Sequence, residues 1–223
     1  MTTLRHAAQI AWRDIAIELR TRESLSTMLL LALMLLAIFA FGFQLRVGDM
    51  REVAPGVLWV SFAFTGMLGL SRSLTRDRNQ GILEGLMLSP VDRGAIYAGK
   101  VLANLAAMLA TEALILPLFQ ALFGVPVISA PLLLIAVLGS IGFVAIGTSL
   151  AAMTVNTRAR EALLPVLLFP VTVPVLIAAV QATGALLEGE GWAAIVHWVR
   201  LLLAYDAIAL ISGYLTSESI LEQ

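Results

Sequence analysis

The run LSTMLLLALMLLAIFAFGFQL, residues 25–45, decides the class of this protein, because it contains no charged residue. A helix that crosses the hydrocarbon core of a bilayer needs about 20 largely apolar residues, so this run is long enough to span a membrane. It is longer than the roughly 7–15 apolar residues of a secretory signal, and a long charged segment precedes it. We therefore interpret it as a retained first transmembrane helix.

Five further apolar runs of similar character follow along the chain. They cover approximately residues 54–72, 95–123, 131–153, 162–187 and 193–215. The run at 95–123 is long enough to tilt or to project beyond the bilayer. The run at 162–187 contains Pro165, Pro170 and Pro174, each of which removes a backbone donor, so we expect that helix to be kinked or broken. The sequence thus predicts an all-α, polytopic integral membrane protein with six transmembrane helices in a single domain, 1–223.

The composition supports this class. The chain is 60% hydrophobic and only 13% charged, whereas a soluble domain carries about 25% charged residues. The absence of cysteine excludes disulfides, thiol nucleophiles and thiolate metal sites. The two histidines, His6 and His197, lie at opposite ends of the chain, and no convincing Ser/His/Asp set is present. We therefore predict no catalytic residue and no metal site in this chain.

Basic residues are distributed unevenly among the connections between the predicted spans. Eleven lie in the N-terminal segment and in the connections after the second and fourth spans. Only Arg46 and Arg51 lie on the opposite side, where Asp49 and Glu52 balance them. The positive-inside rule places the arginine-rich side, and with it both termini, in the cytoplasm.

The first 22 residues form an amphipathic pattern of their own. Leu4, Ala8, Trp12, Ile15 and Leu19 recur at spacings of three and four residues, which is one face of a helix. The arginines lie largely on another face. This pattern favours a helix in the membrane interface with its arginines toward anionic lipid. A short cytoplasmic helix packed on other protein remains the alternative.

Four ionisable side chains fall within predicted spans: Glu112, His197, Arg200 and Asp206. Charged groups are costly inside a membrane and often functional, so all four are candidate functional residues. The alternative is that they lie near helix ends or form structural pairs. Arg200 and Asp206 are six residues apart, about 120° around an ideal helix, so they are poor partners within it. They would have to pair across helices.

Small residues recur at four-residue spacing along residues 95–123. Examples are Ala103 with Ala107 and Ala106 with Ala110. Small side chains allow helices to approach closely in lipid. This pattern indicates packing faces rather than a ligand site.

One motif of soluble enzymes is nearly complete. The segment GAIYAGK, residues 94–100, satisfies the first seven positions of a phosphate-binding P-loop. The next residue is Val101, where a Ser or Thr would hold magnesium, and the segment leads into a membrane helix. We interpret the match as accidental, so any ATP that drives this protein binds to another chain.

The connection TRDRNQGILEGLMLSPVDR, residues 75–93, is the most distinctive segment outside the spans. It predicts a short amphipathic helix from Gly81 to Ser89, stopped at Pro90. An apolar patch with a charged rim is suited to docking another protein. A second interfacial helix on lipid is the alternative, which the acidic residues mixed into the segment mildly disfavour.

Three features carry a resemblance to a known family. They are APGVLWV at residues 54–60, Asp77 followed by GILEGLMLSP at residues 81–90, and the prolines of the span 162–187. Together they resemble the CcmB family, heme exporter protein B, which is the membrane permease subunit of the ABC-type system for cytochrome c maturation. The resemblance covers residues 50–180 best, and it extends to the first and last spans only in general layout.

The resemblance implies a bacterial inner-membrane permease of the type-2-like exporter class that has no ATPase domain. It implies a separate ATP-binding subunit, CcmA, the membrane proteins CcmC and CcmD, and two copies each of the permease and the ATPase. Residues 1–24 would be an elbow helix and residues 75–93 would carry the coupling helix. The residues expected to dock on the ATPase are Asp77, Gly81, Leu83, Glu84, Leu86, Met87 and Pro90.

The cargo stays open at this point. The resemblance implies either export of heme or release of a heme-loaded chaperone, with heme as a transported or handled ligand and no firmly bound cofactor. No paired histidines for axial heme ligation are present. Two rival functions remain: a non-transporting scaffold for assembly proteins, and an ion-coupled carrier that uses Glu112, Arg200 and Asp206. The lack of an obvious inverted repeat of broken helices weakens the carrier hypothesis.

Overall fold

The computed structural model describes residues 2–43, 50–79, 81–82, 85, 91–154 and 160–220. Every regular element in these ranges is an α-helix, which confirms the predicted all-α class. The helices are α1 (Thr2–Thr21), α2 (Glu23–Phe43), α3 (Met50–Asn79), α5 (Arg93–Phe123), α6 (Ala130–Thr154), α7 (Arg160–Leu187) and α8 (Trp192–Ile220).

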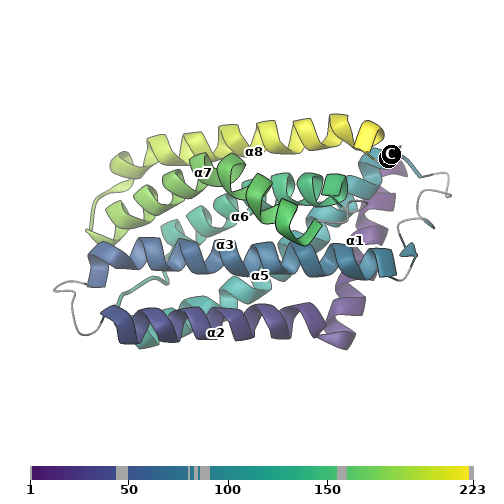
Figure 1. The fold of residues 1–223 in the computed structure, drawn as a ribbon. Coiled ribbons are helices and arrows are strands. Elements are labelled where there is room, and N and C mark those ends of the chain that lie inside the picture. Colours follow the sequence, from purple (N-terminus) through teal and green to yellow (C-terminus); the bar gives the residue numbers. More distant parts are fainter. Residues whose placement is uncertain are drawn as a thin grey trace.

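Six of the described helices form a lengthwise bundle, and the seventh crosses one end of it. Figure 1 shows α2, α3, α5, α6, α7 and α8 side by side, with α1 running across the end that also holds the C-terminus. Each of the six bundle helices is long and apolar enough to cross a membrane. The structure therefore confirms the predicted polytopic membrane protein with six spans among its described residues.

Two helices form the centre of the bundle. The most apolar stretches of α3 and α6 are 67% and 61% buried, whereas those of α2 and α8 are only 22% and 28% buried. Trp59 of α3 fills the space between them. Its ring meets Phe62 edge-on at 5.5 Å, and its indole N–H donates to Thr183 of α7 at 3.0 Å. A Cβ atom at Gly139 of α6 would collide with this ring, so the close approach of α3 and α6 depends on that glycine.

The helix boundaries differ most from the sequence prediction at α3. The apolar run ends near residue 72, but the helix continues to Asn79. No glycine or proline interrupts residues 71–79, and the polar side chains there find partners, so the helix has no reason to stop at the edge of the apolar run. Residues 75–79, which were expected in a loop, are therefore the last turn of α3.

Two other expectations concern long or proline-containing helices. At 1.5 Å per residue the 31-residue α5 is about 46 Å long, so it extends beyond a hydrocarbon core of about 30 Å. The proline-containing span was expected to be kinked or broken; a break is wrong, because α7 runs as one helix through Pro165, Pro170 and Pro174. The Tyr205 hydroxyl of α8 donates to the Val171 carbonyl of α7 at 2.8 Å and so joins the two helices next to Pro170.

Candidate functional site

A buried lysine joins three helices at the α1 end of the bundle. The ammonium group of Lys100, on α5, lies 2.5 Å from Asp14 Oδ2 on α1 and 2.5 Å from Asp77 Oδ2 on α3. The side chains of Asp14 and Asp77 are 3% and 2% exposed, and that of Lys100 is 10% exposed. We call these three residues the lysine triad. Because one cation serves two carboxylates, the triad holds α1, α3 and α5 at a single point.

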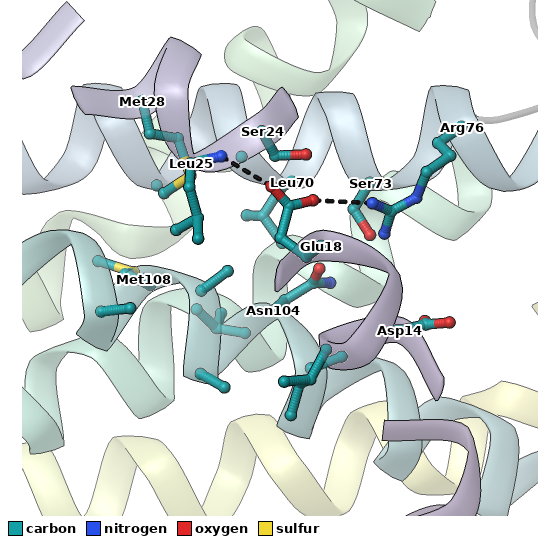
Figure 2. Close-up of a pocket in the computed structure, with 18 of the residues that line it drawn as sticks. Asp14, Glu18, Ser24, Leu25, Met28, Leu70, Ser73, Arg76, Asn104 and Met108 are labelled. Atoms are coloured by element: carbon teal, nitrogen blue, oxygen red, sulfur yellow. Dashed lines mark hydrogen bonds and ion pairs between the residues drawn. The ribbon is translucent and has the colours of Figure 1, made fainter. Parts of the chain in front are cut away.

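Three further charged residues extend the triad. Arg13 donates to Asp14 Oδ1 at 2.7 Å, and Arg76 donates to Glu18 Oε2 at 2.8 Å. The other oxygen of Glu18 accepts the backbone N–H of Leu25 at 2.9 Å, close to the start of α2 (Figure 2). We call the six residues Arg13, Asp14, Glu18, Arg76, Asp77 and Lys100 the charged cluster. It contains three acidic and three basic side chains and is therefore neutral in sum.

The local pattern of α1 places its acidic residues in this cluster. Asp14 and Glu18 are four residues apart and share the buried face of α1 with Ala7, Ile10 and Ala11, which packs against α5. A Cβ atom at Gly99 of α5 would collide with Ile10 and with the Ala7 carbonyl. The glycine thus allows α1 to approach closely enough for Lys100 to reach Asp14.

The apolar face of α1, about 100° around the helix from the buried face, remains uncovered. Leu4, Trp12 and Leu19 are 79%, 70% and 60% exposed. These residues belong to the apolar face that the sequence predicted for a membrane interface. Each of the two interpretations of residues 1–22 therefore describes one face of α1. The buried face packs on protein, and the apolar face is free to contact lipid.

The electrostatics of Asp14 give a pH prediction. Burial alone would raise the pKa of its carboxyl, but the Lys100 ammonium and the Arg13 guanidinium outweigh burial and hold the pKa below its usual value of 3.8. The stability that Asp14 contributes is therefore fully present above the unfolded-state pKa and is lost as the pH falls through the folded-state pKa. We expect Asp14→Asn to lower the unfolding temperature at neutral pH, and the gap to wild type to close below pH 3.8. Thermal unfolding of both proteins across that range measures this, and a pH-independent gap would contradict it.

Residues of the charged cluster lie on both sides of the connection between α3 and α5: Asp77 precedes it in the chain and Lys100 follows it. Asp77 lies in the last turn of α3, where the sequence placed it in the docking set, and it is buried in the triad. Gly81 follows with a positive φ of 63°, and its N–H donates to the Arg78 carbonyl at 3.1 Å. The N–H of Gly85 donates to the Gly81 carbonyl at 3.1 Å. Five other predicted docking residues lie outside the described residues and remain predictions: Leu83, Glu84, Leu86, Met87 and Pro90.

At the far side of this connection, the start of α5 is fixed by Asp92. Its Oδ1 atom accepts the N–H of Gly94 at 3.3 Å and so caps the helix. Its Oδ2 atom accepts the hydroxyl of Tyr214, near the end of α8, at 3.2 Å. Both ends of the connection are therefore held by carboxylates with partners on other helices.

The segment that resembles a P-loop is explained by the same geometry. Residues 94–100 are helical throughout, and Lys100 is neutralised by two carboxylates. A P-loop lysine instead lies in a loop and points at phosphates. The structure supports the interpretation that this match is accidental.

The four candidate residues within the spans are not brought together. Glu112 is buried in α5 and accepts the hydroxyl of Ser140, on α6, at 2.5 Å. Asp206 is buried in α8 against Gly142 of α6, where a Cβ atom would collide with its carboxylate. Positions 140 and 142 are about 200° apart around α6, so the two carboxyl groups lie on different sides of it.

The two basic candidates lie on the outside of α8. His197 and Arg200 are exposed, and His197 packs on the neighbouring Trp198 ring at 4.5 Å. Within the described residues, neither Arg200 nor Asp206 takes part in an ion pair, so the cross-helix pairing considered from the sequence is not found there. The described part of the chain also contains no group of three metal-ligating side chains.

Sequence reasoning missed the triad, although two signals pointed to it. Lys100 is the only lysine of the chain. Asp14 and Glu18 are acidic residues four apart in a segment that is otherwise basic. A buried cation with acidic partners on other helices explains both observations.

Six apolar spans among the described residues, with an amphipathic helix across one end of the bundle, define a polytopic α-helical membrane protein. Its sequence matches the family model described as CcmB protein over residues 5–221. The chain belongs to the CcmB family, as the resemblance in its sequence predicted.

Individual relatives are similar over most of their length. Heme exporter protein B of Pseudomonas aeruginosa is 30% identical over 167 residues, which cover 73% of this chain and 75% of the relative. Heme exporter protein B of Paracoccus denitrificans is 29% identical over 199 residues, covering 88% of this chain and 91% of the relative. The protein of the same name from Shigella flexneri is 30% identical over 214 residues, covering 82% and 87% respectively.

Proposed function

We propose that this chain is the membrane permease subunit of an ABC-type transporter for cytochrome c maturation, and that a separate subunit, CcmA, hydrolyses the ATP. The observation that carries this proposal is the charged cluster. It ties the helix before the docking connection, α3, to the helix after it, α5, and ties both to α1. A force applied to the connection by an ATPase would therefore act on three helices together.

Such coupling requires that the ATPase make different contacts in two conformations of the permease. In our proposal the helix at residues 81–90 seats on the ATPase dimer, and closure of that dimer displaces the ends of α3 and α5. The central position of α3, between α2, α6 and α7, would carry the displacement into the bundle. Two permease copies and two ATPase copies would form the complete unit.

The orientation follows from the arginines. Arg72, Arg76, Arg78 and Arg93 belong to the same end of the bundle as α1. By the positive-inside rule this end faces the cytoplasm, where ATP is available. We place the chain in the bacterial inner membrane with both termini inside.

The cargo is proposed from the relatives, which carry the name heme exporter protein B. Either this permease moves heme outward, or ATP turnover releases a heme-loaded chaperone from a complex that includes CcmC and CcmD. His197 is the only histidine within a span, and it is exposed on α8. Heme that co-purifies with the permease–ATPase pair and is lost in His197→Ala, but not in His6→Ala, supports direct handling.

The docking proposal has a direct test. We expect Leu86→Asp and Glu84→Arg to abolish co-purification of CcmA, because one places a charge in the apolar patch and the other reverses the charge at its rim. The matched control is Glu188→Arg, the same charge reversal in the exposed connection at the opposite end of the bundle. Affinity purification of the tagged permease from membranes that contain CcmA measures the effect.

Two results would count against the proposal. Wild-type recovery of CcmA with both docking variants would show that residues 81–90 are not the docking segment. ATPase activity that is the same with and without this subunit would favour a passive scaffold over a permease.

A further inference from the structure

A cavity of about 110 Å³ lies beside the charged cluster, where α1, α2, α3 and α5 meet. Figure 2 shows the two sides of this cavity. One side carries the polar side chains of Ser24, Ser73, Glu18 and Arg76, and the apolar side chain of Met28 lies toward the other side. The remaining walls are mainly apolar or small, from Gly66 and Gly69 of α3, Met108 of α5 and the alanines of α5, and the polar side chains of Asp14 and Asn104 also line the cavity. The cavity is therefore amphipathic, with a polar end at the charged cluster and an apolar interior.

The cavity lies at the depth of the boundary between lipid headgroups and acyl chains. Its α2 wall consists of Ser24, Leu25 and Met28, which fall within the first six residues of that span. At 1.5 Å per residue these positions cover about 8 Å from the start of the span. An amphipathic helix in the membrane interface lies about 5–10 Å into the same boundary, and α1 forms the neighbouring wall.

The cavity is open to the outside of the bundle. Leu19 lines it and is 60% exposed, and Ala110 lines it and is also exposed. The alanines predicted to mark a packing face are thus not fully covered by protein. Ala106 and Ala107 are only half-buried and line the cavity together with Ala110.

We propose that this cavity binds the first few methylene groups of one acyl chain of a phospholipid from the leaflet on the α1 side, with the ester oxygens of that lipid at Ser24 and Ser73. The side chains of Met28 and Met108 are flexible and adapt to an irregular hydrocarbon segment. Among the described residues neither serine hydroxyl has a hydrogen-bond partner, so both are available as donors to an ester. The charged cluster is neutral in sum, so the polar end suits an ester better than a free ion.

Two other occupants fit less well. A buried water needs about 10–15 Å³ and two to four polar partners, so a cavity this large and mainly apolar would leave most waters unpartnered. A macrocyclic ligand is too large for 110 Å³. Hydrocarbon chains surround this opening in a membrane, and a segment of a few methylene groups next to the ester is small enough to enter 110 Å³.

The test uses a photoreactive lipid. The purified chain is placed in vesicles of phosphatidylethanolamine and phosphatidylglycerol that contain a phosphatidylethanolamine with a diazirine near the ester of one chain. After irradiation, mass spectrometry of peptides locates the label. We expect it to concentrate on Ser24–Met28 and Ala103–Ala110.

Substitutions that fill the cavity should displace the lipid. In Ala107→Leu we expect roughly tenfold less label at these segments, because displacing two methylene groups of the chain weakens binding by about that factor. Ala113→Leu is the matched control, since Ala113 is exposed on the same helix and does not line the cavity. If Ala107→Leu fails to fold, Ala110→Leu at the exposed mouth replaces it. Label spread evenly over the outward faces of α2, α7 and α8, or unchanged in the filled variant, would overturn the proposal.

Discussion

Replacing Lys100 by methionine is expected to be among the most destabilising single changes in this chain. It removes the cation shared by Asp14 and Asp77 and leaves two carboxylates that are 3% and 2% exposed. Removing one partner of a buried ion pair costs about 3–5 kcal/mol, because the remaining charge is left uncompensated. Lys100→Met should therefore lower the unfolding temperature in detergent strongly and reduce the amount of monodisperse protein.

The matched control removes the whole triad. In the triple variant Asp14→Leu, Lys100→Met, Asp77→Leu no charge of the triad remains, and Arg13, which loses its partner Asp14, is 38% exposed and can be hydrated. Replacing buried ions by apolar side chains is often neutral or stabilising. We expect this variant to recover much of the stability that Lys100→Met loses. Equal unfolding temperatures for wild type and Lys100→Met would show that the triad does not hold α1 on the bundle.

The second large effect is expected at the centre of the bundle. In Gly139→Ala the new methyl group collides with the ring of Trp59, which is 3% exposed and hydrogen-bonded to Thr183. The ring has no free space to enter, so α3 and α6 must separate or the hydrogen bond must break. Overpacking of this kind costs about 1–3 kcal/mol. Thermal or denaturant unfolding in detergent, followed by Trp fluorescence, measures the loss.

Replacing a glycine by alanine in α3, at Gly56, should instead raise the stability of the protein. Gly56 lies within α3, and no atom lies within 4 Å of a Cβ built there. Alanine in place of a helical glycine stabilises by about 0.5–1 kcal/mol, because it restricts the unfolded chain. A loss of stability in Gly56→Ala as large as that in Gly139→Ala would mean that the Trp59 contact is not what makes Gly139→Ala destabilising.

The sequence predicted the six membrane spans well, because a span is recognised from the length of its apolar run alone. The run 95–123 begins and ends within two residues of α5, and the run 131–153 lies within one residue of α6 at each end. The end of α3 was missed because hydropathy marks the membrane boundary and not the helix boundary. The prolines were overestimated as helix breakers, because α7 continues as one helix through all three of them and a membrane helix tolerates the lost backbone donors within a bundle.

The candidate site was only half predictable. Asp77 was predicted as a docking residue for the ATPase, and its buried ion pair with Lys100 was not foreseen, since the two are brought together only when α3 and α5 pack. Asp14 lies 86 residues from Lys100 in the chain, and no periodicity relates positions that far apart. Exposed candidates such as Arg200 and buried ones such as Glu112 looked alike in the sequence, because hydropathy does not show which side of a helix faces lipid.

The separation between Asp14 and Lys100 also imposes an order on biogenesis. A ribosome that adds roughly 5–20 residues per second needs about 4–17 s to synthesise the 86 residues between them. During that interval the first helix of the nascent chain has neither its lysine nor the surface of α5 on which to pack. Its exposed leucines and tryptophan are suited to hold this helix on the membrane surface while the next spans are inserted. The N-terminal helix is therefore made first, but it can reach its final position only after the third span has entered the bilayer.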